Sequence, residues 1–150
     1  MNERYLFRGK RIDNGEWVTG RYCNQIKCIN GAIHVVDVIQ IVTKNDCGAT
    51  VTHHFEVDLD TVGQCTGLSD KTNELIFVGD IVAISCYSYE EPEQDAFGEI
   101  LELEFGYGIL DEETGEPIYL SDFRGSYRTI YAIYGTIHDS PELLKRGESE

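Results

Sequence analysis

Apolar and polar residues alternate along much of this chain with a period of two, which is typical of β-strands with one covered face. The first clear element is a hairpin that pairs residues 5–11 with residues 16–22. Asn14-Gly15 lies between these segments, and both residue types tolerate the positive φ angles of a type I′ turn. The pattern therefore predicts an N-terminal β-hairpin with a two-residue turn.

A second Asn-Gly pair, Asn30-Gly31, separates residues 25–29 from a long apolar run at residues 34–43. Apolar side chains in this run fall on both faces of any strand, because they occupy adjacent as well as alternate positions: Val35, Val36, Val38, Ile39, Ile41 and Val42. A strand of this kind has to be covered on two sides. A second sheet or another subunit could provide that cover, and the excess of apolar surface predicts a homo-oligomer.

The rest of the chain also favours strands, at residues 50–57, 81–89, 101–105 and 127–137, with a single helical turn at residues 58–63. A turn-rich centre containing Gly63, Gly67, Asp70 and Asn73 divides the strands into two groups. We therefore expect a mainly β protein with an N-terminal β unit at residues 1–72 and a second unit at residues 73–150, either as two closely packed units or as a single domain.

One short C-terminal helix is also expected, because Ser140-Pro141-Glu142 supplies an N-cap, a proline at the first turn and an acid that complements the helix dipole. Leu143 and Leu144 would dock this helix.

The charge of the chain argues against most nucleic-acid and membrane roles. It has 27 acidic and 12 basic side chains among 150 residues, a formal net charge of −15 that repels phosphate backbones and anionic lipids. The acidic residues concentrate at residues 90–95, at residues 111–116 and at the C-terminus. The N-terminal hairpin is the exception, because it combines cations with a tryptophan: Arg8, Lys10, Arg11, Trp17 and Arg21.

These five residues have two interpretations. Alternation alone can produce a solvated hairpin face whose aromatic residues pack inward. The same residues could also form an interaction surface that binds nucleic acid by charge and stacking.

The chain has no apolar signal region at its start and no run of about 20 apolar residues that could span a bilayer. A cytoplasmic protein is therefore expected, with no membrane partner. Its five cysteines are an odd number without an export signal, so we expect reduced thiols: Cys23, Cys28, Cys47, Cys65 and Cys86.

Candidate chemistry is weak throughout the sequence. His53 and His54 with Cys47 and Cys65 are zinc-ligand types, but adjacent histidines on a strand point to opposite faces. No nucleophile motif or phosphate-binding glycine loop is present. Paired acids such as Asp58 with Asp60, or Asp70 with Asp80, are typical of turns in which aspartate hydrogen-bonds its own backbone. We therefore expect no enzyme activity, no cofactor, no metal and no catalytic residue.

Five ordered blocks nevertheless form a recognisable pattern. They are Phe-Arg-Gly-Lys at residues 7–10, Gly-Glu-Trp-Val-Thr-Gly at 15–20, Thr-Val-Gly-Gln-Cys-Thr-Gly-Leu-Ser-Asp-Lys at 61–71, Gly-Asp-Ile-Val at 79–82, and Ile-Tyr-Gly-Thr-Ile-His-Asp-Ser-Pro-Glu-Leu-Leu at 133–144. Together they span nearly the whole chain, and the order is more specific than any single block. The sequence resembles the YopX family of phage and prophage proteins.

The resemblance implies a β-rich fold with a small SH3-like barrel in the second half and no established catalytic activity. It also implies a scaffold role for the recurring glycine and aspartate positions, which we treat as fold determinants: Gly63, Gln64, Thr66, Gly67, Asp70, Gly79 and Asp80.

Two hypotheses about function follow from the sequence. The first is a phage accessory protein that acts by binding, as an oligomer or to a host or phage protein. The second is a nucleic-acid or replication-associated binder that uses the N-terminal hairpin. The acidic segments could form the functional face instead, by imitating DNA.

Overall fold

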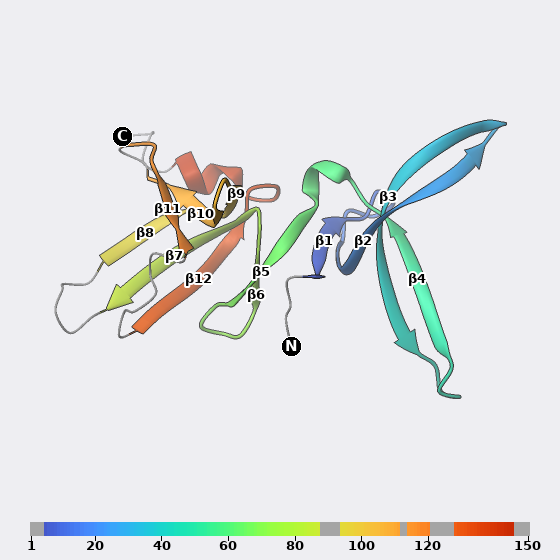
Figure 1. The fold of residues 1–150 in the computed structure, drawn as a ribbon, viewed down its shortest axis with the longest axis horizontal. Coiled ribbons are helices and arrows are strands. Elements are labelled where there is room, and N and C mark those ends of the chain that lie inside the picture. The colour runs from blue at the N-terminus through green and yellow to red at the C-terminus, as the bar shows by residue number, and fades with distance from the viewer. Residues whose placement is uncertain (1–4, 88–93, 112–113, 121–127, 146–150) are drawn as a thin grey trace. The chain divides into compact units, whose positions relative to one another are not determined.

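The computed structural model describes residues 5–87, 94–111, 114–120 and 128–145, which form a mainly β protein (Figure 1). The chain divides into two compact units, Met1–Cys65 and Thr66–Glu150. The strand β5 (Gly63–Ser69) carries the chain from the first unit into the second. We describe each unit separately.

The first unit is built from antiparallel strands that follow one another along the chain. Besides the first residues of β5, it contains β1 (Phe7–Lys10), β2 (Trp17–Ile29), β3 (Ala32–Lys44), β4 (Thr50–Glu56) and the 3-10 helix η2 (Leu59–Thr61). Each strand from β1 to β4 pairs with the next, and β1 also pairs with the start of β5. The predicted hairpins are confirmed by this order.

The two Asn-Gly pairs form different turns. Asn30 and Gly31 have φ angles of 51° and 81°, so the turn between β2 and β3 has the two positive φ angles of a type I′ turn. At the first turn only Gly15 has a positive φ, and the amide of Arg11 donates to the carbonyl of Glu16. The predicted two-residue turn at Asn14-Gly15 is therefore wrong, because a longer loop closed by Gly15 joins β1 to β2.

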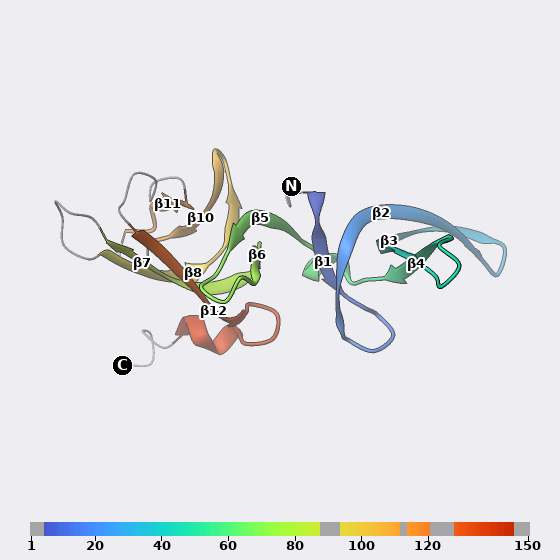
Figure 2. The ribbon, with the colours of Figure 1, turned by 90° about the horizontal axis from the view of Figure 1, so that it is seen from below.

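The strands β2 and β3 are each 13 residues long and do not keep the same neighbour along their length. The first residues of β2 pair with β1, and the remainder pairs with β3. The second half of β3 pairs with β4. β2 bends strongly where it changes partner (Figure 2). As a result, two ribbons extend from the centre of the first unit, one made by β2 and β3 and the other by β3 and β4 (Figure 1).

The second unit contains shorter strands arranged in separate small sheets. Its elements are β6 (Leu75–Phe77), β7 (Asp80–Tyr87), β8 (Gln94–Glu99), β9 (Leu101–Leu103), β10 (Gly106–Leu110), β11 (Pro117–Tyr119), β12 (Arg128–Thr136) and the 3-10 helix η4 (Pro141–Lys145). One three-stranded sheet has the order β12-β7-β8 and another has the order β11-β10-β9. Both consist of antiparallel pairs.

A core of large aliphatic side chains joins the elements of the second unit: Ile76, Val82, Ile84, Ile100, Ile109 and Leu120. The sheets around this core are open within the described residues, so the SH3-like barrel is not confirmed. The predicted C-terminal helix is not confirmed as an α-helix either. Residues Pro141–Lys145 form a single 3-10 segment, which is too short to close several α-helical turns.

Candidate functional site

Three residues of the predicted basic surface come together on one face of the first hairpin. Lys10 lies directly opposite Trp17 in the β1–β2 register, and Arg8 lies two pairs further along, on the same face. The guanidinium carbon of Arg8 is 4.7 Å from the centroid of the Trp17 ring, and the ammonium nitrogen of Lys10 is 5.5 Å from it. Both distances are typical of cation–π contacts. The exposed face of Trp17 is therefore already in contact with cations of its own hairpin.

Arg11, by contrast, contacts other residues than Trp17. Its guanidinium donates to both carboxylate oxygens of Asp13, at 2.9 and 2.6 Å, and lies 4.5 Å from the centre of the Phe55 ring on β4. The hydrogen bond from Arg11 lowers the pKa of Asp13, although both groups lie at the surface. The positive charge of Arg11 is thus largely balanced by a neighbouring carboxylate.

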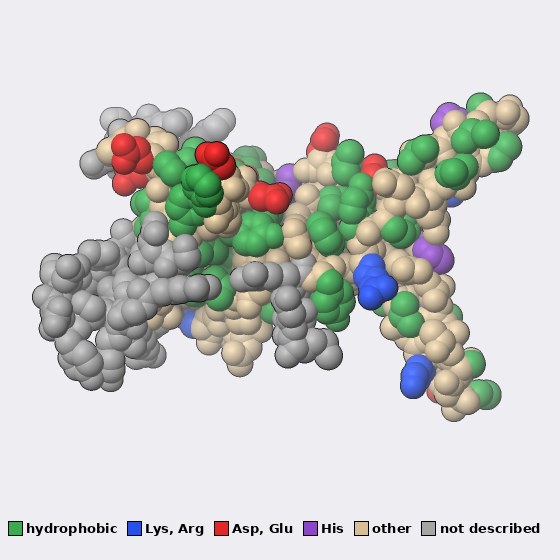
Figure 3. Space-filling view, in the orientation of Figure 1, with side chains coloured by type: hydrophobic (Ala, Val, Ile, Leu, Met, Phe, Trp, Pro, Cys, Tyr) green, Lys and Arg blue, Asp and Glu red, His purple; other side chains and the backbone are tan. Residues whose placement is uncertain are grey.

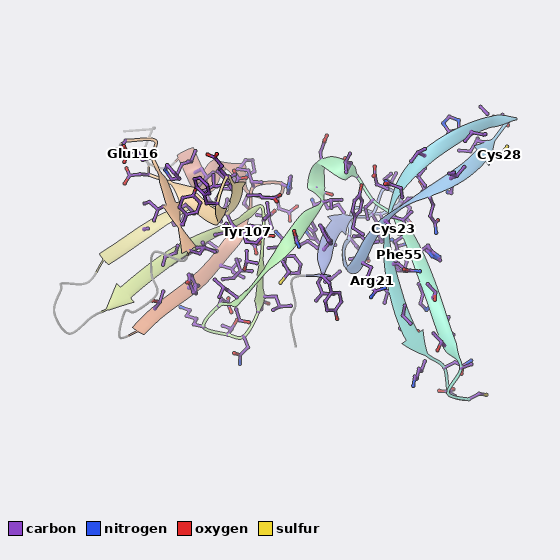
Figure 4. All side chains as sticks on the ribbon, viewed as in Figure 1. Arg21, Cys23, Cys28, Phe55, Tyr107 and Glu116 are labelled. Carbon is purple, nitrogen blue, oxygen red and sulfur yellow. The ribbon has the colours of Figure 1, made fainter. Side chains whose placement is uncertain are left out.

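Arg21 lies on β2 (Figure 4). It lines an open cavity of about 470 Å³. The cavity forms where β2 and β3 separate, since their pairing ends at Arg21 and Gln40. It is lined by Tyr5, Leu6, Thr19, Gly20, Arg21, Gln40, Ile41 and Val42. Its lining mixes aliphatic and polar side chains with one cation, and it contains no carboxylate, imidazole or thiol.

The β2–β3 ribbon carries a feature that the sequence indicated only in part. Ile26 pairs with Val35 and Cys28 pairs with Ile33, so these four side chains share one face of the ribbon. We call this set the ribbon face. Its aliphatic members are largely uncovered: Ile26 is 76% exposed, Ile33 75% and Val35 68%. The sequence singled out the run from Val35 to Val42, but not the opposite strand.

The apolar run of β3 is buried at its centre. Val38 and Ile39 are 1% and 0% exposed where β3 lies between β2 and β4, and as adjacent residues they point to opposite faces. Val42 is 57% exposed on the β3–β4 ribbon. Coverage on both faces is therefore limited to the middle of the strand, and hydrophobic side chains gather along the β2–β3 ribbon (Figure 3).

The candidate metal ligands are dispersed. Cys47 is exposed in the turn between β3 and β4, Cys65 is buried, and the imidazoles of His53 and His54 contact Thr43 and Gln40 respectively. Within the part of the chain that the structure describes, no three His, Cys, Asp or Glu side chains form a group that could hold a metal ion. The side chains of the acidic segment at residues 90–95, and those of residues 112 and 113 in the segment at 111–116, fall outside the described part of the chain.

The acidic pairs act on their own backbone. Asp58 caps η2 by accepting from the amide of Asp60 at 3.1 Å. Asp70 Oδ1 accepts from the amides of Thr72 and Glu74, at 2.8 and 2.9 Å, and from the hydroxyl of Thr72 at 2.7 Å. These contacts close the turn between β5 and β6.

Burial of Asp70 acts to raise the pKa of its carboxyl group. The hydrogen bonds from Thr72 and Glu74 outweigh that effect, so the pKa of Asp70 is lowered overall. A carboxylate with a lowered pKa in the folded state stabilises the protein above its ordinary pKa, and the stabilisation is lost as the pH falls through the lowered value.

We therefore expect Asp70→Asn to cost about 1–2 kcal/mol of stability at pH 7, because charge-assisted hydrogen bonds to backbone amides are lost. The difference between Asp70→Asn and the wild type should shrink below about pH 4, since the wild-type carboxylate becomes protonated there. Urea unfolding followed by circular dichroism, at pH 7 and below about pH 4, measures the difference in stability between the two proteins. A difference that grows in acid would contradict the assignment.

The remaining scaffold positions also serve the backbone. Gly63 and Gln64 pair with β1, at Arg8 and Phe7. The hydroxyl of Thr66 donates to the carbonyl of Ile76 at 2.9 Å. Gly67 is exposed at a φ of 84°.

At the start of β7, Gly79 has a φ of 97°, and Asp80 Oδ2 accepts from the amide of Phe77 at 2.8 Å. Asp80 is 1% exposed. This motif therefore holds the entry into the central strand of the β12-β7-β8 sheet.

No helix among the described residues has both the length and the apolar character needed to cross a bilayer. No curated protein matches the chain. Among solved structures, the chain is similar to the crystal structure of protein EF1440 from Enterococcus faecalis. The two are 24% identical with a TM-score of 0.46, over 92% of this chain and 96% of that chain.

A family model gives the decisive match. The model described as YopX protein matches residues 6–145, which includes all five sequence blocks and both structural units. The chain therefore belongs to the YopX protein family.

Proposed function

We propose that this protein is a non-catalytic interaction module that binds other protein surfaces through the ribbon face of its first unit. The observation that carries the proposal is the exposure of Ile26, Ile33 and Val35 on one face of a two-stranded ribbon. Large aliphatic side chains that lie together at the surface mark protein-binding sites more often than isolated ones do. Family membership adds the proposal that the protein is a phage or prophage accessory protein that acts in the bacterial cytoplasm.

The absence of an assembled acid, base and nucleophile among the candidate residues supports a non-catalytic role. Asp58, Asp70 and Asp80 each accept hydrogen bonds from backbone amides, and His53 and His54 contact the neutral side chains of Thr43 and Gln40. Groups used in this way hold turns and strands rather than carry out proton transfer. The SH3-like character of the second unit stays a prediction from the family resemblance.

A second candidate function is binding of nucleic acid by the cluster of Arg8, Lys10 and Trp17. The convergence of two cations on one indole ring favours it, because phosphate contacts and base stacking need such groups. The net charge of −15 opposes it, and both cations already lie over the ring. We therefore rank it below protein binding.

One crosslinking experiment in bacterial cells separates the two functions. A photo-crosslinking amino acid is placed at Ile33 on the ribbon face, at Thr19 beside Arg8, or at Ile12 as a control. Ile12 is 64% exposed and apolar, but it lies in the loop between β1 and β2. We expect discrete protein adducts from position 33 and none from position 12, because only the ribbon face is proposed to bind.

Adducts from position 19 that disappear on nuclease treatment would instead favour nucleic-acid binding. Equal protein adducts from positions 33 and 12, or none from position 33, would contradict binding through the ribbon face. The readout is gel mobility followed by mass spectrometry of each adduct.

A further inference from the structure

The two sides of the β2–β3 ribbon differ. One side is the ribbon face, with Ile26, Cys28, Ile33 and Val35. The opposite side is mixed: it carries Gln25, Lys27 and His34 as well as Ile29, Ala32 and Val36, and Lys27 forms an ion pair with Glu56 of β4. The mixed side is thus tied to the rest of the first unit, and the ribbon face is left uncovered. Cys28 lies near the end of this ribbon (Figure 4).

A ribbon of two strands does not normally hold its shape alone in water. Residues 24–29 of β2 pair only with β3 among the described residues, and residues 32–36 of β3 pair only with β2. Ile26 and Ile33 are 76% and 75% exposed, so the described residues cover only about a quarter of each side chain. A further layer on the ribbon face would give this ribbon the packing that it lacks.

The distribution of charge restricts which partner can supply that layer. Residues 17–57 carry three Lys or Arg side chains and three Asp or Glu side chains, so their net charge is zero. The remainder of the chain carries nine basic and 24 acidic side chains, which accounts for the whole net charge of −15. Two copies therefore repel each other everywhere except along the neutral ribbons.

An apolar face is also complementary to itself, because it needs no opposite charge across the contact. Twofold association presents the same patch on both subunits. A face two strands wide and about seven residues long offers roughly 200–250 Å² per copy, from the usual spacings of strands and residues. Two such faces bury far less than a standard interface of about 1,600 Å², so weak association is expected.

We propose that the ribbon face binds the ribbon face of a second copy of this chain. This proposal rests on the proposed function and names the partner of that same surface. Bringing the uncovered faces together removes Ile26, Ile33 and Val35 from water in both copies. The acidic parts of the chain then lie outside the neutral ribbons that meet.

The salt dependence of self-association distinguishes this proposal from binding by opposite charges. Counter-ions screen the repulsion between two acidic chains and leave apolar contact intact. Self-association should therefore become at least about threefold tighter between 0.05 and 0.5 M NaCl. Binding that depends on attraction of opposite charges, such as nucleic-acid binding, changes in the other direction.

The test is analytical ultracentrifugation of the purified full chain under reducing conditions, from about 5 to 500 μM, a range chosen for a contact of this size. We expect a monomer–dimer equilibrium that tightens with salt. Ile26→Thr with Ile33→Thr should weaken it at least about tenfold, because threonine keeps strand propensity but replaces apolar surface. The matched control is Ile12→Thr with Leu59→Thr, two residues that are 64% and 54% exposed elsewhere in the first unit.

Crosslinking of cysteines gives an independent readout that does not depend on the threonine substitutions. Cys28 lies on the ribbon face, whereas Cys47 is equally classed as exposed but lies in the β3–β4 turn. A short bis-maleimide crosslinker should join two copies in the wild type and in Cys47→Ser, and the product should be lost in Cys28→Ser. Equal crosslinking in both variants would overturn the proposed contact.

A monomer at every concentration in 0.5 M NaCl would also overturn the proposal, as would a dimer that is unaffected by the double threonine variant. If the chain is a monomer but position 33 crosslinks to a different protein in cells, the proposed function holds and the partner is not a second copy. If position 33 gives no adduct, both fail.

Discussion

Gly20→Ala is expected to destabilise the first unit by about 3 kcal/mol, which is the upper range for forcing extra volume into a packed site. A Cβ atom at position 20 would lie 2.3 Å from the backbone oxygen of Gln40 and 3.1 Å from Ile39 Cγ2. A backbone oxygen cannot rotate away as the end of a side chain can. The substitution therefore pushes β2 and β3 apart where the β2–β3 ribbon begins.

Trp17 is the single tryptophan of the chain and lies in the first unit, so its fluorescence during urea unfolding reports on that unit. The midpoint should fall clearly for Gly20→Ala. The matched control is Gly135→Ala, whose added Cβ meets Leu143 Cδ1 at 3.3 Å and Ser140 Cβ at 3.4 Å. These are side-chain atoms in the second unit, so the Trp17 midpoint should stay unchanged. An unchanged midpoint for Gly20→Ala would show that the close approach does not constrain the fold.

Asp80→Ala is expected to cost the second unit about 2–3 kcal/mol, because it leaves the buried amide of Phe77 without its carboxylate acceptor. Asp80 is 1% exposed, so water cannot easily replace the lost oxygen. Its own carbonyl accepts from Ile100, and the amide of Gly79 donates to the carbonyl of Ile100. Loss of the side chain therefore loosens the point where β7 meets the segment between β8 and β9.

Urea unfolding followed by far-ultraviolet circular dichroism measures the loss for Asp80→Ala. Asp80→Asn keeps an acceptor oxygen at similar volume and should lose roughly half as much, since a neutral acceptor is weaker than a charged one. Glu102→Ala, at an exposed position, serves as the surface control. If Asp80→Ala unfolds at the same urea concentration as Glu102→Ala, the carboxylate does not hold the start of β7.

Several elements could be predicted because their signals are local. Asn30-Gly31 marks its hairpin by two residues that accept positive φ, and β4 contains valine, phenylalanine and two threonines, which favour strands. β5 was missed and taken for part of a turn-rich centre, because Gly63 and Gly67 are typical of turns. Its pairing with β1 depends on residues more than 50 positions away. Local propensity carries no information on such a partner.

The candidate surface was predictable to a similar degree. Alternation placed Arg8 and Lys10 on one face, and the register with Trp17 follows from the hairpin. The contacts of Arg11 with Asp13 and Phe55 could not be predicted together, because Phe55 lies on β4, in a distant part of the chain. The ribbon face was predicted only through Val35, and the alternate apolar residues Ile26 and Cys28 on β2 were not singled out, because exposure depends on what surrounds a strand.

Residue types and their order were enough to predict that this protein is mainly β, where its hairpins lie, how its charge is divided, and that it follows the pattern of the YopX family. These properties are local. The burial of individual residues is not: Val38 and Ile39 are covered while Val35 is exposed on the same strand. β3 pairs with β2 alone at Val35 and with both β2 and β4 at Val38 and Ile39, so burial depends on contacts between segments distant in the sequence and not on hydrophobic character alone.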